Sequence, residues 1–222
     1  MRSHFNRSAL VRQLAGWLPV PEEPSRQDLA ERLGAWLNVA DAITLASAHQ
    51  SLPRLAAKRR TPARQTAADP KADLDRVRGT LAQAIATPPH PPTDASDTEF
   101  APHNQRYLDQ QRRMEMAIDA LRGHVRQVLA ATSPQLAQLA AMDAMLDQML
   151  GGREQRVLNG VPAIVKARFT QLRQSQPDTW PAPFEQDFQQ VLLAELDLRL
   201  QPVMGMVDAF DKRDAGAPVL KK

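Results

Sequence analysis

Apolar side chains recur in the phase of a coiled coil between residues 102 and 131, and this pattern constrains the fold more than any other. The positions step alternately by four and three residues, which keeps them on one side of an α-helix. Such a helix is about 45 Å long and must bury its apolar side against other helices. The pattern therefore predicts a bundle of long helices. Its members are Tyr107, Gln111, Met114, Ile118, Leu121, Val125 and Val128, of which only Gln111 is polar.

The residues that favour strands are scarce. The chain has one tyrosine and six phenylalanines in 222 residues, and it has no cysteine. A low content of aromatic and β-branched residues disfavours sheets, and the lack of cysteine excludes disulfides and cysteine-ligated metals. We expect an all-α fold: an elongated antiparallel helical bundle with coiled-coil-like long helices and a smaller helical N-terminal part.

Prolines and helix-capping residues divide the chain. Asp69-Pro70 and Ser133-Pro134 each place an N-cap residue before a proline at the first helical position. Gly151-Gly152 marks the end or a kink of the helix that begins at 134. The predicted parts are an N-terminal helical segment 1–52, a basic linker 53–69, a connecting helix 70–86, a Pro-rich disordered linker 87–101, a C-terminal bundle 102–212 and a frayed tail 213–222.

Two further apolar stripes are expected to face inward. One follows Ser25, which is predicted to cap a helix that ends near Leu52. The other follows Pro134, and its methionines are interpreted as core filler, with an adaptable binding surface as the alternative. The last helix begins near Phe184 and is predicted to kink at Pro202. The first stripe is Leu29, Leu33, Trp36, Ala40 and Ile43, and the second is Leu136, Leu139, Met142, Leu146 and Met149.

No arrangement of side chains predicts catalysis. The five histidines are scattered, and no two of them lie one helical turn apart, as two metal ligands on one helical face would. Asp143 and Asp147 are one turn apart, and Glu195 precedes Arg199 by four residues, which is the order of a solvated surface pair. We expect no enzyme activity, no metal and no cofactor.

Positive charge gathers within residues 54–64. Residues 1–80 hold 13 basic and 8 acidic groups, although the whole chain carries only +3. Arg54, Lys58, Arg59, Arg60 and Arg64 are candidate anion contacts, with a solvated linker as the alternative. No aromatic residues are interleaved with them for base stacking. The segment 7–18 is amphipathic and is interpreted as a docking helix or a lid on the bundle rather than a membrane-surface helix. Because no apolar run is long enough to span a bilayer, we expect the cytoplasm.

Four segments resemble a proteobacterial family that is catalogued only as a domain of unknown function. They lie at 9–14, at 33–37 together with 41–43, at 121–126 (Leu-Arg-Gly-His-Val-Arg) and at 193–203. The resemblance covers most of the chain except 53–69 and 87–101. These are helical packing signatures, so no catalytic residue is carried over. The resemblance implies a bacterial protein that works beside cell-envelope proteins.

These observations predict a non-enzymatic helical interaction or adaptor protein, which docks partner helices or associates with a second copy of itself. The candidate interface is Met114, Ile118, Leu121 and Val125, on the long helix. The alternative is a nucleic-acid-associated regulator that uses residues 54–64.

Overall fold

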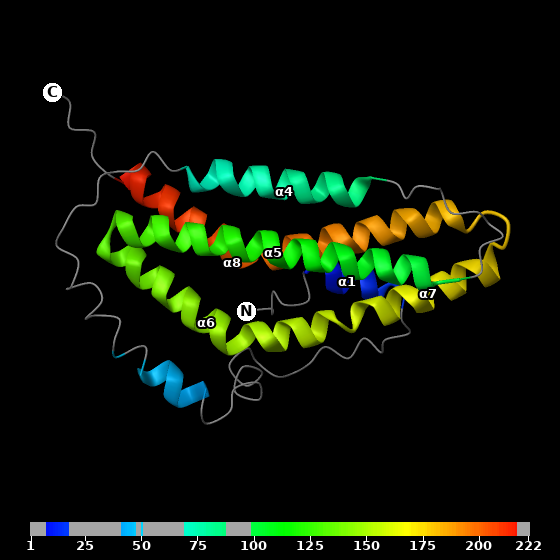
Figure 1. Cartoon of the computed structure of the whole chain (residues 1–222), viewed down its shortest axis with the longest axis horizontal. Helices are drawn as coiled ribbons and strands as arrows, with labels where there is room; N and C mark the ends of the chain where they lie inside the picture. The colour runs from blue at the N-terminus through cyan, green and yellow to red at the C-terminus, as the bar shows by residue number, and fades with distance from the viewer. Residues whose placement is uncertain (1–7, 18–40, 48–49, 51–68, 88–98, 217–222) are drawn as a thin grey trace. The chain divides into compact units, whose positions relative to one another are not determined.

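The computed structural model describes residues 8–17, 41–47, 50, 69–87 and 99–216. All of the regular secondary structure in these ranges is helical, and no strand occurs in them. The all-α prediction is therefore confirmed (Figure 1). The helices are α1 (Ala9–Ala15), α4 (Pro70–Ala86), α5 (Ala101–Thr132), α6 (Pro134–Leu158), α7 (Val161–Ser175) and α8 (Pro181–Gly216).

The chain forms two compact units, and both combine segments that are distant in the sequence. The first unit comprises residues 1–29, 78–117 and 153–199. The second unit comprises residues 30–77, 118–152 and 200–222. Helices α4, α5, α6 and α8 therefore each contribute one part to each unit.

Two helices begin where the sequence predicts an N-cap. The Asp69 carboxylate accepts hydrogen bonds from the backbone N–H groups of Lys71 and Ala72, both at 3.0 Å. The Ser133 hydroxyl accepts one from the Leu136 N–H at 3.2 Å. Each cap satisfies donors that the first turn of a helix leaves without a backbone partner. The boundaries of α4 and α6 thus follow from local chemistry.

In the first unit, successive helices alternate in direction. Gln110 at one level of α5 donates to the Ala84 carbonyl of α4, while Arg106, one turn earlier, donates to the Thr87 carbonyl, so α4 and α5 are antiparallel. Arg106 also pairs with Glu185, and Gln111 with Glu195. Residue numbers increase together in these last pairs, so α5 and α8 are parallel. Two helices run parallel to each other when both are antiparallel to a helix that lies between them in the sequence.

Aromatic rings fill the core of the first unit around one buried histidine. His103 is 5% exposed, and its ring centroid lies 4.9 Å from that of Phe184 and 5.5 Å from that of Phe169. Trp180 is fully buried in the turn before α8. Edge-to-face contacts such as Phe169–Trp180, at 5.0 Å and 80°, suit the charge distribution of aromatic rings. These few large side chains, far apart in sequence, supply one core.

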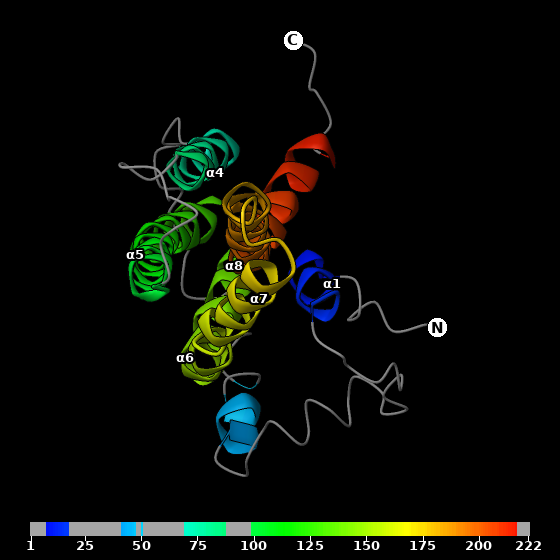
Figure 2. The same cartoon turned by 90° about the vertical axis from the view of Figure 1, so that its right-hand side faces the viewer.

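Helix α1 lies beside α7 and α8 in the first unit (Figure 2). Leu10 is buried, the Gln13 amide donates to Gln190 at 3.0 Å, and the Arg168 guanidinium lies 5.6 Å from the centroid of the Trp17 ring. The interpretation of this segment as a docking helix agrees with these contacts.

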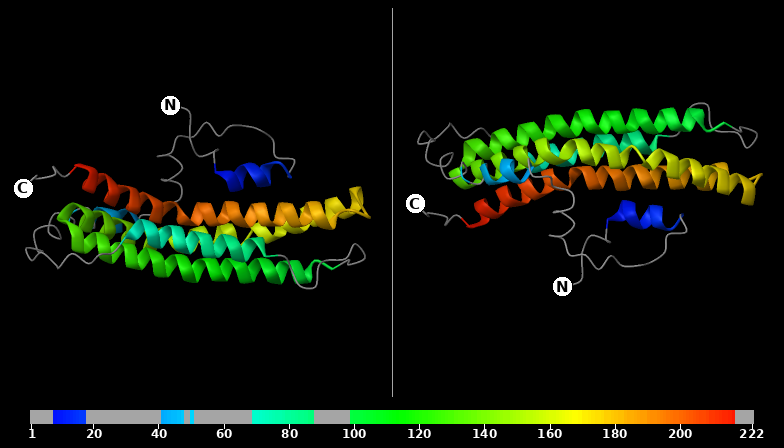
Figure 3. Two further views of the ribbon diagram at one scale, coloured as in Figure 1. Left: turned by 90° about the horizontal axis from the view of Figure 1, so that it is seen from above. Right: turned by 90° about the horizontal axis from the view of Figure 1, so that it is seen from below.

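In the second unit, α6 turns back along the second half of α5 from Ser133 (Figure 3). The N-terminal part of α4 contacts the same stretch of α5, where Asp73 pairs with His124 at 3.2 Å. The interior of the unit is aliphatic. Its buried residues include Leu74, Val125, Leu129, Leu136, Val203 and Val207.

Several boundaries differ from the predictions. Helix α6 continues through Gly151 and Gly152 to Leu158, so the glycine pair does not end it. Helix α8 continues past Pro202, as the prediction of a kink rather than an end requires, but it extends to Gly216, beyond the predicted end of the bundle at 212. Of the predicted helix before Pro53, residues 41–47 are described and helical, but Ile43 is 62% exposed rather than inward.

Candidate interaction surface

The predicted interface on the long helix is instead interior. Met114 and Val125 are fully buried, and Ile118 and Leu121 are each 5% exposed. These four side chains are covered by the chain itself, because a sustained apolar seam on a helix is the first surface that its neighbours bury. The prediction that they contact a partner is wrong for this structure. The candidate anion contacts Arg54, Lys58, Arg59, Arg60 and Arg64 lie outside the described residues.

A buried polar cluster in the first unit centres on Glu195. Its carboxylate is 0% exposed and accepts hydrogen bonds from Tyr107 Oη at 2.8 Å, Gln111 Nε2 at 2.9 Å and Arg199 Nε at 2.9 Å. Gln111 also donates to the Leu158 carbonyl at 3.2 Å. The prediction that Glu195 and Arg199 form a solvated surface pair is therefore wrong. Both Tyr107 and Gln111, the polar member of the predicted seam, meet Glu195 from α5.

The Glu195 cluster holds helices together and has the character of a structural site. Burial, with the negative charge of Glu195, raises the pKa of the Tyr107 phenol far above its ordinary value, so the phenol remains a hydrogen-bond donor. Acid–base catalysis needs a group that a substrate can reach. The Glu195 carboxylate has no solvent-exposed surface, and all its partners belong to the chain.

A second polar cluster, in the second unit, joins two arginines of α5 to two aspartates of α6. Arg122 makes a two-pronged contact with Asp143, at 2.8 and 2.7 Å, and reaches Asp147 at 2.7 Å. Arg126 contacts the same two carboxylates at 2.7 and 2.8 Å. Burial would raise the pKa of Asp143, but hydrogen bonds from Arg122 and Arg126 outweigh it and hold the pKa below its ordinary 3.8.

This cluster determines which side of α6 faces inward. Leu136, Ala140 and Asp143 are all at most 9% exposed and follow each other at steps of four and three, so they mark the inner side. The predicted stripe from Leu136 to Met149 faces inward only at its first residue. The aspartates face α5 because Arg122 and Arg126 lie there.

The remainder of that stripe forms a half-exposed apolar seam, which we call the α6 seam: Leu139, Met142, Leu146 and Met149. Met142 is 39% and Leu146 38% exposed, while Leu139 and Met149 are half-buried. Their spacing of three, four and three residues is that of a coiled-coil seam. From Pro134 to Gly152 the only charged residues are Asp143 and Asp147, and both pair with α5. The seam is thus an uncharged, partly open helix face.

The sequence contains a signal for the α6 seam in the composition of residues 134–152, although the spacing of their apolar side chains favours the core. Nineteen residues with two charges, four leucines and three methionines can be apolar on more than one side. A helix that is apolar all round is usually buried. Here the second apolar side remains partly open.

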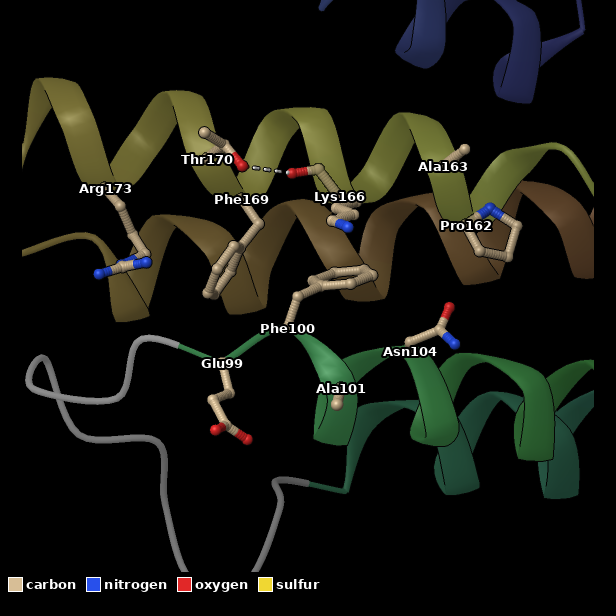
Figure 4. A pocket seen from close by; sticks show the side chains of 10 residues that line it. All are labelled: Glu99, Phe100, Ala101, Asn104, Pro162, Ala163, Lys166, Phe169, Thr170 and Arg173. Atoms are coloured by element: carbon tan, nitrogen blue, oxygen red, sulfur yellow. Dashed lines mark hydrogen bonds between the residues drawn. The ribbon is translucent and has the colours of Figure 1, made fainter.

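A hollow of about 680 Å³ lies between the start of α5 and α7 in the first unit (Figure 4). Its floor contains the rings of Phe100 and Phe169, whose centroids are 5.4 Å apart. Lys166 and Glu99 at its rim are exposed, and in Figure 4 the Glu99 carboxylate points away from the two rings. Its lining brings no acid and base together in a buried setting, which catalysis would require.

The described residues gather no three histidine, aspartate or glutamate side chains in a way that could hold a metal ion. In the same ranges, no helix has both the length and the hydropathy to cross a membrane.

A family model described as "Protein of unknown function (DUF3348)" matches residues 1–212. The chain belongs to this family. The resemblance to a domain of unknown function is therefore confirmed, and the DUF3348 match also includes the stretches 53–69 and 87–101, which the resemblance left out. Searches of the curated proteins and of the solved structures found no match to the chain.

Two segments that carry the resemblance to DUF3348 supply the polar clusters. Residues 121–126 contain Arg122 and Arg126, and residues 193–203 contain Glu195 and Arg199. A third segment, 9–14, lies in α1. In this DUF3348 chain the resemblance therefore coincides with residues that fix how helices pack.

Proposed function

We propose that this chain is a non-enzymatic helical interaction protein, and that the α6 seam receives a helix of a partner protein. The observation that supports the proposal is the half-exposed heptad spacing of Leu139, Met142, Leu146 and Met149 on a stretch of α6, Pro134 to Gly152, whose only charges face α5. A surface helix ordinarily presents charged residues to water. An uncharged apolar side is typical of a contact with another protein.

The seam offers a modest binding energy. Burying a leucine or methionine side chain completely contributes about 1.5–3 kcal/mol. Because Met142 and Leu146 are 39% and 38% exposed, covering the four seam residues would contribute on the order of 3 kcal/mol per helix. Association also costs translational and rotational freedom. The proposal is thus of a reversible docking surface rather than a permanent interface.

Two lysines in the seam test the proposal. Met142→Lys combined with Leu146→Lys places charge on the open face, and lysine avoids adding to the carboxylates of α6. Met116→Lys is the matched control, because Met116 is 70% exposed on α5 and lies outside the seam. Circular dichroism should show the same helix content for all three proteins.

Each protein is then immobilised and exposed to a soluble extract and to a detergent-solubilised envelope extract of the native host. The envelope extract tests the association that the family resemblance implies. We expect wild type and Met116→Lys to retain the same proteins, and the double variant to lose them. Identical retention by all three proteins would contradict the proposal.

The nucleic-acid alternative rests on residues 54–64 and stays a prediction, because this segment lies outside the described residues. Fluorescence polarisation with random duplex and single strands at two salt concentrations tests it. Binding that weakens steeply with salt is the expected result for contacts to phosphate.

A further inference from the structure

We infer that the helix received by the α6 seam is the α6 of a second copy of this chain, in an antiparallel pair. The inference rests on the proposed function and names the partner.

The seam matches its own reverse. In an antiparallel pair with a twofold axis between Met142 and Leu146, Met142 of one copy faces Leu146 of the other, and Leu139 faces Met149. Every contact then joins a leucine to a methionine, so each layer has the same composition. A twofold contact uses one surface patch on both subunits, and it is the commonest symmetry among oligomers.

Because the α6 seam carries no charge, it favours a partner surface that is also uncharged. Pairing two seams brings no like charges together, because Asp143 and Asp147 are held by Arg122 and Arg126 on the inner side. A partner surface with charges at the contact would have to lose their hydration against Leu139, Met142 and Leu146, which costs free energy that no opposite charge on the seam offsets. The seam is therefore complementary to itself. Antiparallel pairing also places the ends of opposite helix dipoles together.

The contact is short. From Leu139 to Met149 the helix rises about 15 Å, at 1.5 Å per residue. An interface of this length is at the small, transient end of protein contacts, so we expect a weak and rapidly reversible pair that forms only at high protein concentration.

Sedimentation of the full chain tests whether the pair forms. We expect the weight-average mass to rise from that of the 24.6 kDa monomer toward twice that value as the protein concentration increases from about 0.1 mM into the millimolar range. Met142→Lys with Leu146→Lys should remain monomeric, and Met116→Lys should behave as wild type. A wild type that is monomeric throughout this range overturns the inference.

Cysteine pairing tests the geometry without a disruptive variant, because the chain has no cysteine of its own. Met142→Cys and Leu146→Cys are prepared separately, one of them with a size tag, and oxidised alone or mixed. Antiparallel pairing predicts at least about fivefold faster disulfide formation in the mixture than in either protein alone, because only the mixed pair brings two sulfurs to the same level. Faster bridging of each variant with itself, or a rate equal to that of Met116→Cys, overturns the inference.

The outcomes separate this inference from the proposed function. Self-pairing is overturned if the wild type is monomeric and its α6 seam still retains another protein. It is equally overturned if the wild type is monomeric and cross-linking joins the seam to the chain's own residues 25–52. In both cases the seam remains a docking surface. A monomeric wild type with no seam-dependent contact overturns both.

Discussion

Replacing Glu195 with leucine should destabilise the first unit severely. The carboxylate is fully buried and accepts hydrogen bonds from Tyr107, Gln111 and Arg199 at 2.8 to 2.9 Å. Leucine has a similar size but no acceptor, so it leaves three donors, one of them charged, without this partner. Removing one member of a buried ion pair costs about 3–5 kcal/mol. We therefore expect Glu195→Leu to lower the free energy of unfolding by about 4 kcal/mol, a large share of the 5–15 kcal/mol typical of folded proteins.

Two companion variants show whether the buried charge is the cause. Glu195→Gln keeps the shape and one acceptor, and it should cost about 1.5–3 kcal/mol, the range for a hydrogen bond to a charged group. Glu195→Leu combined with Arg199→Met removes both charges. Because replacing a buried ion pair by apolar residues is often close to neutral, the double variant should recover most of the loss.

The measurement is urea unfolding of the four proteins, followed by far-ultraviolet circular dichroism and by tryptophan fluorescence. Of the three tryptophans, Trp17 and Trp180 lie in the first unit, so the fluorescence signal reports mainly on the unit that contains Glu195. A decrease in unfolding free energy of less than about 1 kcal/mol for Glu195→Leu would refute the reasoning, since burying an arginine without its carboxylate partner should destabilise the fold by more than that. A double variant less stable than Glu195→Leu would refute it equally.

Three further predictions concern other parts of the chain. The folded-state pKa of Asp143 is below its ordinary 3.8, so the stability that the ionised carboxylate contributes is present above pH 3.8 and is lost as the pH falls through the folded-state pKa. Asp143→Asn should therefore flatten the acid branch of a plot of unfolding free energy against pH. An unchanged slope would contradict this. Gly152→Ala should raise the free energy of unfolding by about 0.5–1 kcal/mol, because Gly152 is inside α6 with nothing within 4 Å of an added Cβ. Gly160→Ala should raise it less, because the added Cβ would lie 3.2 Å from a backbone carbonyl oxygen. Chemical unfolding measures both variants, and the reverse order would be inconsistent with the packing. Asp69→Ala should cost about 1 kcal/mol by removing the acceptor of two N–H groups, and no change in unfolding free energy would show that α4 does not depend on its cap.

Interpretation of the polar residues failed where the fold brings distant helices together. The spacing of Glu195 and Arg199 shows that they share one side of a helix, but it does not show whether that side faces water. Tyr107 and Gln111, 88 and 84 residues away, supply the hydrogen bonds that make burial of Glu195 possible. These partners cannot be identified from a single sequence, because nothing local links them to α8.

The prediction of which side of α6 faces inward was wrong for the same reason. By spacing alone, the stripe from Leu136 to Met149 is the natural inner side. The structure turns Asp143 inward, since Arg122 and Arg126 of α5 offer two guanidinium groups to it. The five charge-assisted hydrogen bonds from these arginines to Asp143 and Asp147 outweigh the further burial of a few half-exposed apolar side chains.

The order of residues is enough to predict the all-helical class and the starts of α4 and α6 at the caps Asp69 and Ser133. These features follow from interactions within one or two helical turns, which neighbouring residues specify directly. Which side of each helix is interior depends instead on the assembled fold. That choice depends on pairs such as Arg122 with Asp143, whose energy exists only once two helices lie side by side. It converted the predicted interface around Ile118 into core, and it left the α6 seam partly open.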